Sequence, residues 1–273
     1  MTKISIITVN YNNKIGLKAT IDSVVGQTYE DYEFIIIDGG STDGSVDVIV
    51  KSSDYVDYWV SERDNGVYNG MNKGIAVAHG EYCIFMNSGD CFYSDSVLEQ
   101  IFSVSQSADY VSGDYVTKSG VASSPKTLTL RYMWENAVCH QAVFIRTALL
   151  KAHPYNEDYR IAADWAQMFD ELILRDASYH YIHIIVAILQ PDGISVKGWK
   201  ELAADRKRHL KEALPTRVYE AFQRMQLQDQ ISTKQSKLFS KILYLSSSPI
   251  MTKIVGALVS ILYDILKKRN KKN

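Results

Sequence analysis

The 273-residue sequence lacks several features that would place a chain in a broad class at once. Its cysteines, Cys83, Cys91 and Cys139, have neither metal-ligand spacing nor the even number of a disulfide framework, which favours a reducing compartment. No apolar run reaches the roughly 20 residues that a bilayer-spanning helix needs. The sequence enters a strand pattern directly, with no visible signal peptide. A cytoplasmic location is therefore expected.

Charge of one sign is also missing. The formal net charge is -1, from 30 basic and 31 acidic residues, so the chain has no composition for a broad basic face and no nucleic-acid partner is expected. Two glycine-rich nucleotide motifs, GxGxxG and GxxxxGK[ST], are absent. A bound nucleotide would therefore be held by side chains and a metal rather than by a glycine loop.

Strand and helix patterns alternate over the first hundred or so residues. Buried strands are expected at 3–9, 33–37, 56–60 and 82–86, with amphipathic helices between them. The helix at about 67–79 is expected to end in a left-handed C-cap at Gly80. Looser strand patterns follow at 109–116, 139–145 and 179–189. This order predicts an α/β fold with a mostly parallel central sheet and helices on both faces.

Polar residues stand at the ends of these strands. Thr8 and Asn10 end the first strand, Asp38 ends the second, and Asn87-Ser88-Gly89-Asp90 follows the fourth. Aspartate at such positions also forms turns and helix caps. Together, however, these residues outline one crevice at the carboxyl ends of the strands, where open α/β sheets bind ligands. Carboxylate oxygens there suit Mg²⁺ or Mn²⁺ and a phosphate-bearing ligand.

Five further side chains are candidates for chemistry. Asp64 and Lys73 lie near the same crevice, where they could pair with each other or contact a diphosphate; a solvated lysine is the plainer reading. Asp164 begins a helix, either as a partner of the helix dipole or as a general base whose pKa is raised by burial. His140 and Gln141 could hydrogen-bond sugar hydroxyls or phosphate, although His140 could equally be a core histidine.

The sequence resembles the family-2 inverting glycosyltransferases of the GT-A fold, in particular those of bacterial surface-polysaccharide (colanic-acid-like) clusters. The resemblance covers roughly residues 3–195 and rests on the joint order of its motifs: ISIITVNYN at 4–12, QTY at 27–29, IIIDGGSTDGS at 35–45, SERDNGVYNGMNKGIAVAHGEY at 61–82, FMNSGD at 85–90, CHQAVFIR at 139–146 and YRIAADWAQMF at 159–169.

The resemblance implies roles for individual residues. Thr8, Asn10 and Asp38 match the positions that hold the nucleoside, usually of UDP, and Lys73 matches the basic position near the diphosphate. Asp164 matches the catalytic base. The segment from Asn87 to Asp90 stands where the family has its DxD metal motif, so that Asp90 is the only carboxylate left for Mn²⁺ or Mg²⁺. The diphosphate and water would supply the other ligands, and the loss leaves open a less active or inactive enzyme.

The C-terminal region, 199–273, is expected to be a helical extension of a glycosyltransferase domain at 1–198, whose nucleotide-binding part is about 1–104 and acceptor part about 105–198. Polar residues of 251–268 fall on one narrow stripe, and a basic tail follows. This pattern suits an interfacial helix in 251–273 on an anionic membrane surface, the inner face of the cell membrane. A homodimer contact or docking on the catalytic domain are the alternatives.

The function expected from these features is transfer of a sugar from a nucleotide-diphosphate sugar, a UDP-sugar, to a hydroxyl of a glycan or polyprenyl-linked acceptor. A nucleotidyltransferase is the nearest other enzyme, but its glycine-rich N-terminal motif is missing. From another class, the chain could be a non-catalytic, nucleotide-sugar-binding subunit of a glycan assembly complex. The thinned metal motif supports that alternative, and the intact Asp164 opposes it.

Overall fold

The structure, a computed structural model, describes residues 2–190 and 198–245, and beyond these only 253, 256–258 and 260. It divides into two compact units, Met1–His209 and Leu210–Asn273. The first unit thus runs past residue 198, the predicted end of the catalytic domain. The predicted interfacial helix at 251–268 lies almost wholly outside the described residues. Among those that are described, none of the helices combines the length and the apolarity that crossing a bilayer requires.

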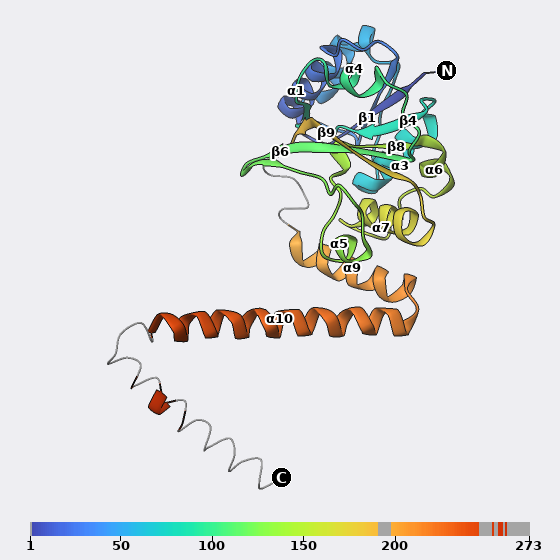
Figure 1. Ribbon diagram of the computed structural model, residues 1–273. Helices are drawn as coiled ribbons and strands as arrows, with labels where there is room; N and C mark the ends of the chain where they lie inside the picture. Colours follow the sequence, from blue (N-terminus) through green and yellow to red (C-terminus); the bar gives the residue numbers. More distant parts are fainter. Residues whose placement is uncertain (1, 191–197, 246–252, 254–255, 259, 261–273) are drawn as a thin grey trace. The chain divides into compact units, whose positions relative to one another are not determined.

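The first unit alternates strands and helices (Figure 1). Its strands are β1 (Ile4–Asn10), β2 (Tyr32–Asp38), β3 (Tyr58–Ser61), β4 (Tyr82–Phe85), β5 (Cys91–Phe92), β6 (Tyr110–Thr117), β7 (Gly120–Ala122), β8 (Val143–Arg146) and β9 (Tyr179–Ile188). Its helices are α1 (Lys14–Val25), α2 (Ser45–Lys51), α3 (Val67–Val77), α4 (Val97–Phe102), α5 (Leu130–Glu135), α6 (Thr147–Ala152) and α7 (Ala163–Phe169). Single turns are η1 (Ser53–Tyr55), η2 (His140–Ala142) and η3 (Asp170–Leu174). Helix α9 (Trp199–Ala213) begins in the first unit, and α10 (Thr216–Leu245) belongs to the second.

All nine strands form one sheet in the order β3-β2-β1-β4-β8-β6-β9-β5, with β7 paired to β6. Strands β3, β2, β1 and β4 are parallel. The other half is mixed, because β8 runs antiparallel to β4 and β6, while β9 is parallel to β6. The predicted parallel sheet is thus the half formed by β3, β2, β1 and β4, and a mixed half extends it.

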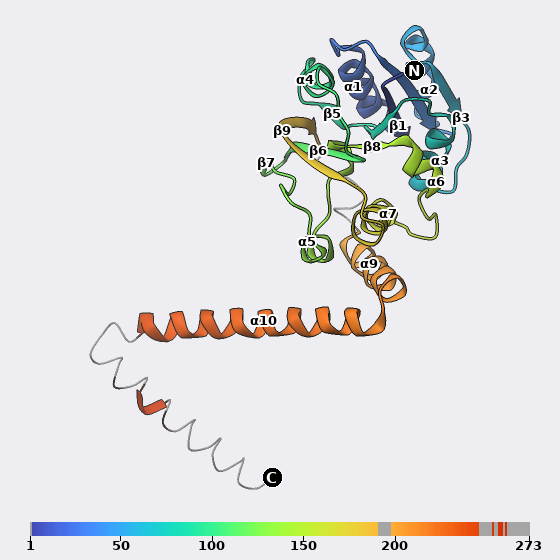
Figure 2. The same ribbon diagram turned by 45° about the vertical axis from the view of Figure 1, so that its right-hand side comes forward.

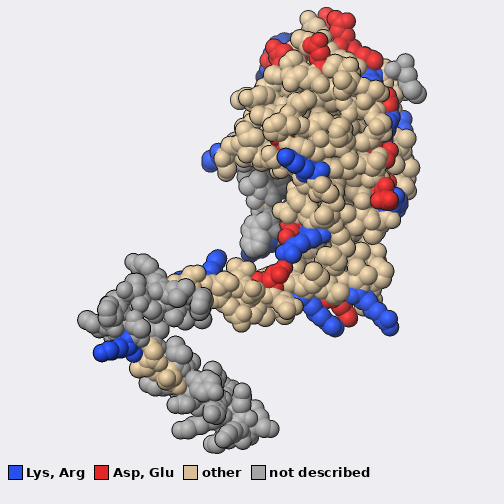
Figure 3. Space-filling view, in the orientation of Figure 1, with Lys and Arg blue, Asp and Glu red and all other residues tan. Residues whose placement is uncertain are grey.

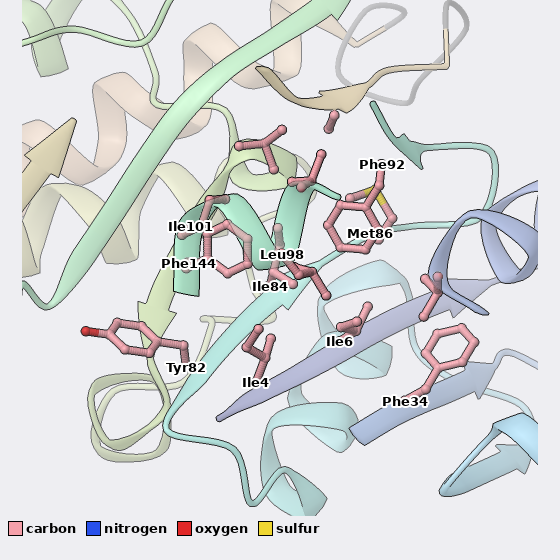
Figure 4. Packing of buried hydrophobic residues seen from close by; sticks show 14 of the residues in the cluster. Ile4, Ile6, Phe34, Tyr82, Ile84, Met86, Phe92, Leu98, Ile101 and Phe144 are labelled. Atoms are coloured by element: carbon pink, nitrogen blue, oxygen red, sulfur yellow. The ribbon is translucent and has the colours of Figure 1, made fainter. Parts of the chain in front are cut away.

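Helices cover both faces of this sheet, as Figure 2 shows for α1 and α4 on one side and α3 and α6 on the other. One cluster joins Ile4, Ile6 and Phe34 of the sheet to apolar residues of α1, α2 and α4 (Figure 4). Successive residues of a strand point to opposite faces, so Ile7, Val9 and Ile37 face the other layer. There a Cβ on Gly74 of α3 would lie 2.5 Å from Cγ2 of Ile7, and α3 therefore packs closely only because it has glycine here.

Two expectations about local structure are wrong. Helix α3 ends in an extended Ala78, and Gly80 is not in the left-handed region, so it is no left-handed cap. Glycine is instead required at position 80 because the backbone of Ser5 lies close to it: a Cβ at this position would be 2.4 Å from the backbone nitrogen of Ser5. The strand expected at 139–145 begins only at Val143, because His140–Ala142 form the turn η2.

Candidate active site

The order of the parallel strands predicts where a ligand would bind at one edge of the sheet. Strand β2 lies on one side of β1 and β4 on the other, so the strand order reverses between β1 and β4. Ligands bind outside the carboxyl ends of strands at such a reversal. Asn10 and Asp38 are the last residues of β1 and β2, and the segment from Asn87 to Asp90 follows β4. The predicted strand-end residues are therefore brought together.

Asp38 anchors this edge as a buried carboxylate. Its oxygens accept hydrogen bonds from the backbone and hydroxyl of Ser41, at 2.9 and 2.6 Å, from the hydroxyl of Ser61 at 2.6 Å and from Nδ2 of Asn10 at 2.7 Å. Burial alone would raise the pKa of Asp38, but these hydrogen bonds outweigh it and lower the pKa. The carboxylate therefore stays ionised and fixes the Asn10 amide.

Two amide oxygens at this edge are left without partners. The Oδ1 atoms of Asn10 and Asn87 are buried and accept no hydrogen bond from any residue that the structure describes. A buried acceptor that lacks a donor costs free energy. A ligand with N–H or O–H groups would therefore gain from binding here.

Thr8 and Asp64 lie at the same edge in different ways. The Thr8 side chain is fully buried, and its hydroxyl donates to the carbonyl of Met86 at 2.7 Å, which ties β1 to the end of β4. Oδ1 of Asp64 accepts from the backbone of Gly66 at 3.0 Å. Its Oδ2 would lie only 2.7 Å from a Cβ on Gly39, so Asp64 rests against the backbone just after β2.

Lys73, on α3, pairs with Glu62 at 2.7 Å rather than with Asp64. Its side chain is 29% exposed and Glu62 is 56% exposed, so the pair is solvated and contributes little to stability. Exchanging this partner for a phosphate would cost little, and the predicted diphosphate contact of Lys73 stays a prediction.

Asp90 is almost fully buried, and protein donors reach both of its oxygens. The backbone N–H of Gln190 donates to Oδ1 at 2.8 Å, and Nε2 of Gln141 donates to Oδ2 at 3.0 Å. Burial raises the pKa of Asp90, and these two hydrogen bonds only partly oppose it. The carboxylate is thus held in one orientation.

The donor set limits what metal could bind. Within the described part of the chain, no group of three histidine, cysteine or acidic side chains could hold an ion. A carboxylate has about four lone-pair positions, and the protein uses two of those of Asp90. Asp90 therefore fits a hard cation whose other oxygen ligands come from a diphosphate and from water. It does not fit an ion that is coordinated by protein side chains alone.

Asp164 lies in the first turn of α7 and is held by two donors. The hydroxyl of Tyr68 is 2.8 Å from Oδ1, and Nδ1 of His140 is 2.9 Å from Oδ2. Burial would raise the pKa of Asp164, but His140 and Tyr68 outweigh it and lower the pKa. The sequence predicts a raised pKa for Asp164, and this prediction is wrong. The buried position also brings the carboxylate within hydrogen-bonding distance of His140 and Tyr68.

The turn η2 connects the two carboxylates. His140 contacts Asp164 through Nδ1, and its Nε2 lies 3.3 Å from Nδ2 of Asn87, while the next residue, Gln141, holds Asp90. Burial lowers the pKa of His140, but Asp164 raises it overall. His140 and Gln141 are thus part of the site; their contact with acceptor or phosphate stays a prediction.

Sequence reasoning missed two residues beside Asp164. Tyr68 stands inside the DNGVYNG stretch, where only the turn and the helix were noticed. Arg206, on α9, has its guanidinium 4.7 Å from the centre of the Trp165 ring, and Trp165 directly follows Asp164. No motif surrounds Arg206 in the sequence, and only the packing of α9 reveals its place.

The fold just described is that of GT-A transferases. S. aureus TarS residues 1–349 in complex with UDP-GlcNAc superimpose with a TM-score of 0.62 at 17% identity, covering 80% of this chain and 69% of that one. The mannosyltransferase PcManGT from Pyrobaculum calidifontis, in complex with GDP-Man and Mn²⁺, gives a TM-score of 0.62 at 14% identity and covers 98% of this chain and 83% of that one.

The sequence profile of Glycosyl transferase family 2 matches residues 5–168, and the chain belongs to this family. It is a glycosyltransferase. A PGL/p-HBAD biosynthesis glycosyltransferase of Mycobacterium bovis is 32% identical over 196 residues, 67% of this chain and 75% of that protein. The Escherichia coli enzyme WfaP, a UDP-Glc:alpha-D-GlcNAc-diphosphoundecaprenol beta-1,3-glucosyltransferase, is 31% identical over 174 residues, 59% of this chain and 69% of that protein.

Proposed function

We propose that the chain is an inverting glycosyltransferase that moves a sugar from a UDP-sugar to a hydroxyl of a glycan or lipid-linked acceptor in polysaccharide biosynthesis. One observation supports this most strongly. The unfilled Oδ1 of Asn10 and the fixed carboxylate of Asp38 share an edge of the sheet with Asn87, which His140 joins to Asp164. This arrangement supports a nucleotide site beside a carboxylate that would act as the base.

Donor binding would use the edge between β1 and β2. Oδ1 of Asn10 is an unfilled acceptor for the base or the ribose, and Asp38 would contact the donor by exchanging one of its four protein hydrogen bonds for one to the ligand. Thr8 ties β1, which carries Asn10, to the end of β4. Asp64, Lys73 and Asn87 would face the rest of the donor. The names of two relatives support a uridine donor: TarS was solved with UDP-GlcNAc, and WfaP is named for UDP-Glc.

Catalysis would rest on Asp164. Its carboxylate takes the proton from the acceptor hydroxyl as that oxygen attacks the anomeric carbon, and the bond from that carbon to the UDP oxygen breaks. A single displacement of this kind inverts the anomeric configuration. Tyr68 and His140 hold the carboxylate in one orientation, and the lowered pKa keeps it ionised at neutral pH.

Asp90 would hold a divalent cation, Mn²⁺ or Mg²⁺, together with oxygens of the donor. When bound, such an ion neutralises the charge that develops on the leaving diphosphate. Two neighbours in structure were solved with Mn²⁺, which supports its use here. Gln141 and the backbone of Gln190 orient Asp90 toward one geometry.

Transfer of the sugar to its acceptor would take place at the inner face of the cell membrane. Residues 251–273 have the apolar and basic pattern of an interfacial helix, and WfaP is named for a diphosphoundecaprenol-linked acceptor. A homodimer contact through the same segment is the competing proposal.

The proposed function is tested with a panel of UDP-sugars. UDP and one UDP-sugar should raise the melting temperature more than GDP and its sugars, because a ligand that binds only the native state stabilises it. That UDP-sugar should then release UDP when a diphosphoprenyl-linked sugar is added, and NMR of the product should show an inverted anomeric centre. Preference for a nucleotide other than UDP would contradict the proposed UDP-sugar donor. Retention of the anomeric configuration would contradict the proposed inverting mechanism.

A further inference from the structure

The middle of α9 is fixed against α7 and the residues on either side of it. Oδ2 of Asp205 accepts from the backbone nitrogens of Arg160 and Ile161, at 3.1 and 3.4 Å. Nε2 of His209 is 2.8 Å from Oδ1 of Asp170. The ring of His209 packs edge-on against the rings of Tyr159, Trp165 and Phe169. The face of α9 that includes residue 206 therefore has a defined position beside Asp164.

Arg206 places a positive charge on this face. Its guanidinium lies over Trp165, and its Nη2 donates to the carbonyl of Asn136 at 2.9 Å. The indole nitrogen of Trp165 donates to the same carbonyl at 3.0 Å. Two contacts therefore hold the guanidinium next to the residue that follows Asp164.

The hydrogen-bonding capacity of Arg206 is not filled. Its Nε is buried and has no partner among the residues that the structure describes. Asp164 forms its ion pair with His140, and its charge reaches Arg206 only at longer range. Burial lowers the pKa of the guanidinium, and only Asp164 and Tyr132 oppose this. A half-buried cation with an unfilled donor favours an anionic ligand.

The contacts of Arg206 place that ligand on the acceptor side. Asn136, whose carbonyl accepts from Arg206, belongs to the proposed acceptor part of the domain, and the ionised group that acts on Arg206 is the carboxylate of Asp164. Lys73 and Asp90, the proposed diphosphate and metal contacts, pair with Glu62 and Gln141 and share no hydrogen-bonding partner with Arg206. Arg206 is therefore set apart from the proposed donor contacts.

We propose that Arg206 binds a phosphoryl group that the acceptor carries near its reacting hydroxyl, as in a glycosyl phosphate or diphosphate. The inference rests on the proposed function and narrows its acceptor. A guanidinium presents paired N–H donors that match phosphate oxygens. The cation also offsets the repulsion between such a phosphate and the ionised Asp164, so an anionic acceptor can approach its base.

Calorimetric titration of inorganic phosphate into the full-length protein tests this. The protein is first saturated with UDP and Mg²⁺, so that the donor's phosphate positions are filled. The wild type should bind phosphate saturably, and Arg206→Gln should bind it about 10-fold more weakly or worse, the loss of one charge-assisted contact. Arg206→Lys keeps the positive charge but not the paired N–H donors of the guanidinium. Its affinity for phosphate should lie between those of the wild type and Arg206→Gln.

Arg208→Gln is the matched control. Arg208 lies on the same helix, stacks 4.4 Å from the centre of the Tyr159 ring and donates to the carbonyl of Asp158, but it lies away from Asp164. Its replacement should leave phosphate binding unchanged. Equal melting temperatures of the two glutamine variants would exclude a folding defect specific to Arg206→Gln.

The outcomes separate the two proposals. A wild type that binds no UDP contradicts the proposed function, and the inference falls with it. A wild type that binds UDP but no further phosphate contradicts the inference alone. Weakened UDP binding in Arg206→Gln would assign Arg206 to the donor's diphosphate and would also overturn the acceptor-side assignment.

Discussion

Replacing His140 with glutamine tests the ion pair that holds Asp164. Nδ1 of His140 is 2.9 Å from Oδ2 of Asp164, and the two side chains are only 20% and 17% exposed. Glutamine can still donate a hydrogen bond but has no charge. Hydrogen bonds to charged groups contribute about 1.5–3 kcal/mol; a bond between two charged partners lies toward the upper end and one in which only the carboxylate is charged toward the lower end, so we expect a loss of roughly 1–1.5 kcal/mol.

The loss should depend on pH in a defined direction. The pKa of His140 is raised in the folded state, so its contribution is complete below the ordinary histidine pKa and is lost as pH rises through the folded-state value. The pKa of Asp164 is lowered, so its contribution is present above the ordinary carboxyl pKa and is lost as pH falls through the folded-state value. The pair should therefore stabilise most between about pH 4 and 6.5.

Thermal unfolding of the wild type and His140→Gln at about pH 5.5 and about pH 9 measures this. A domain of this size changes its melting temperature by roughly 2–4 °C per kcal/mol, so the difference should be about 2–6 °C at the lower pH and smaller at the higher one. His79→Gln is the control, because its pair with Glu33 leaves His79 78% exposed and should contribute little. A difference for His140→Gln that is equal at both pH values, or larger at about pH 9, would refute the charged pair.

Three further outcomes follow from the structure. Asp90→Ala should weaken UDP binding in the presence of Mn²⁺ or Mg²⁺ and change it little in EDTA, as titration calorimetry can show; equal weakening in both would make Asp90 structural. Gly80→Ala should lower the free energy of unfolding by about 1–3 kcal/mol, measured in urea, because its Cβ would meet the backbone nitrogen of Ser5. Deleting residues 251–273 should release the protein from anionic liposomes without changing its affinity for UDP. A full-length protein that does not bind such liposomes would contradict the membrane proposal.

The half of the fold that could be predicted is the half built from local patterns. Buried strands with period-2 faces and amphipathic helices alternate up to about residue 104, and these are β1 to β4 with their helices. Because parallel strands bring their carboxyl ends to one edge, Asn10, Asp38 and Asp90 could be assigned to one crevice before the structure was known.

What could not be predicted depends on long-range contacts. The Asp164 carboxylate meets Tyr68 and His140, which are far from it in sequence, and these contacts reverse the expected direction of its pKa shift. Gly80 has the sequence position of a helix cap, but its neighbour in space is Ser5. Arg206 reaches the site through the docking of α9, which Asp205 and His209 fix.

The surface gives little further information about partners. On the face that Figure 3 shows, acidic and basic side chains of the first unit are interspersed, with several acidic ones gathered at the top of the view. Specificity for the acceptor would therefore depend on individual side chains such as Arg206 rather than on a broad charged surface.

The most direct test of the central claim is the transfer rate of Asp164→Asn with the UDP-sugar that the wild type uses. Asparagine keeps an oxygen that can accept one of the two hydrogen bonds of Asp164, but it cannot take the acceptor's proton. We expect turnover to fall by about 10²–10⁴-fold, the usual loss when a general base is removed, while UDP affinity stays that of the wild type. Near-normal turnover in a folded variant that binds UDP would remove Asp164 from the mechanism and contradict the account.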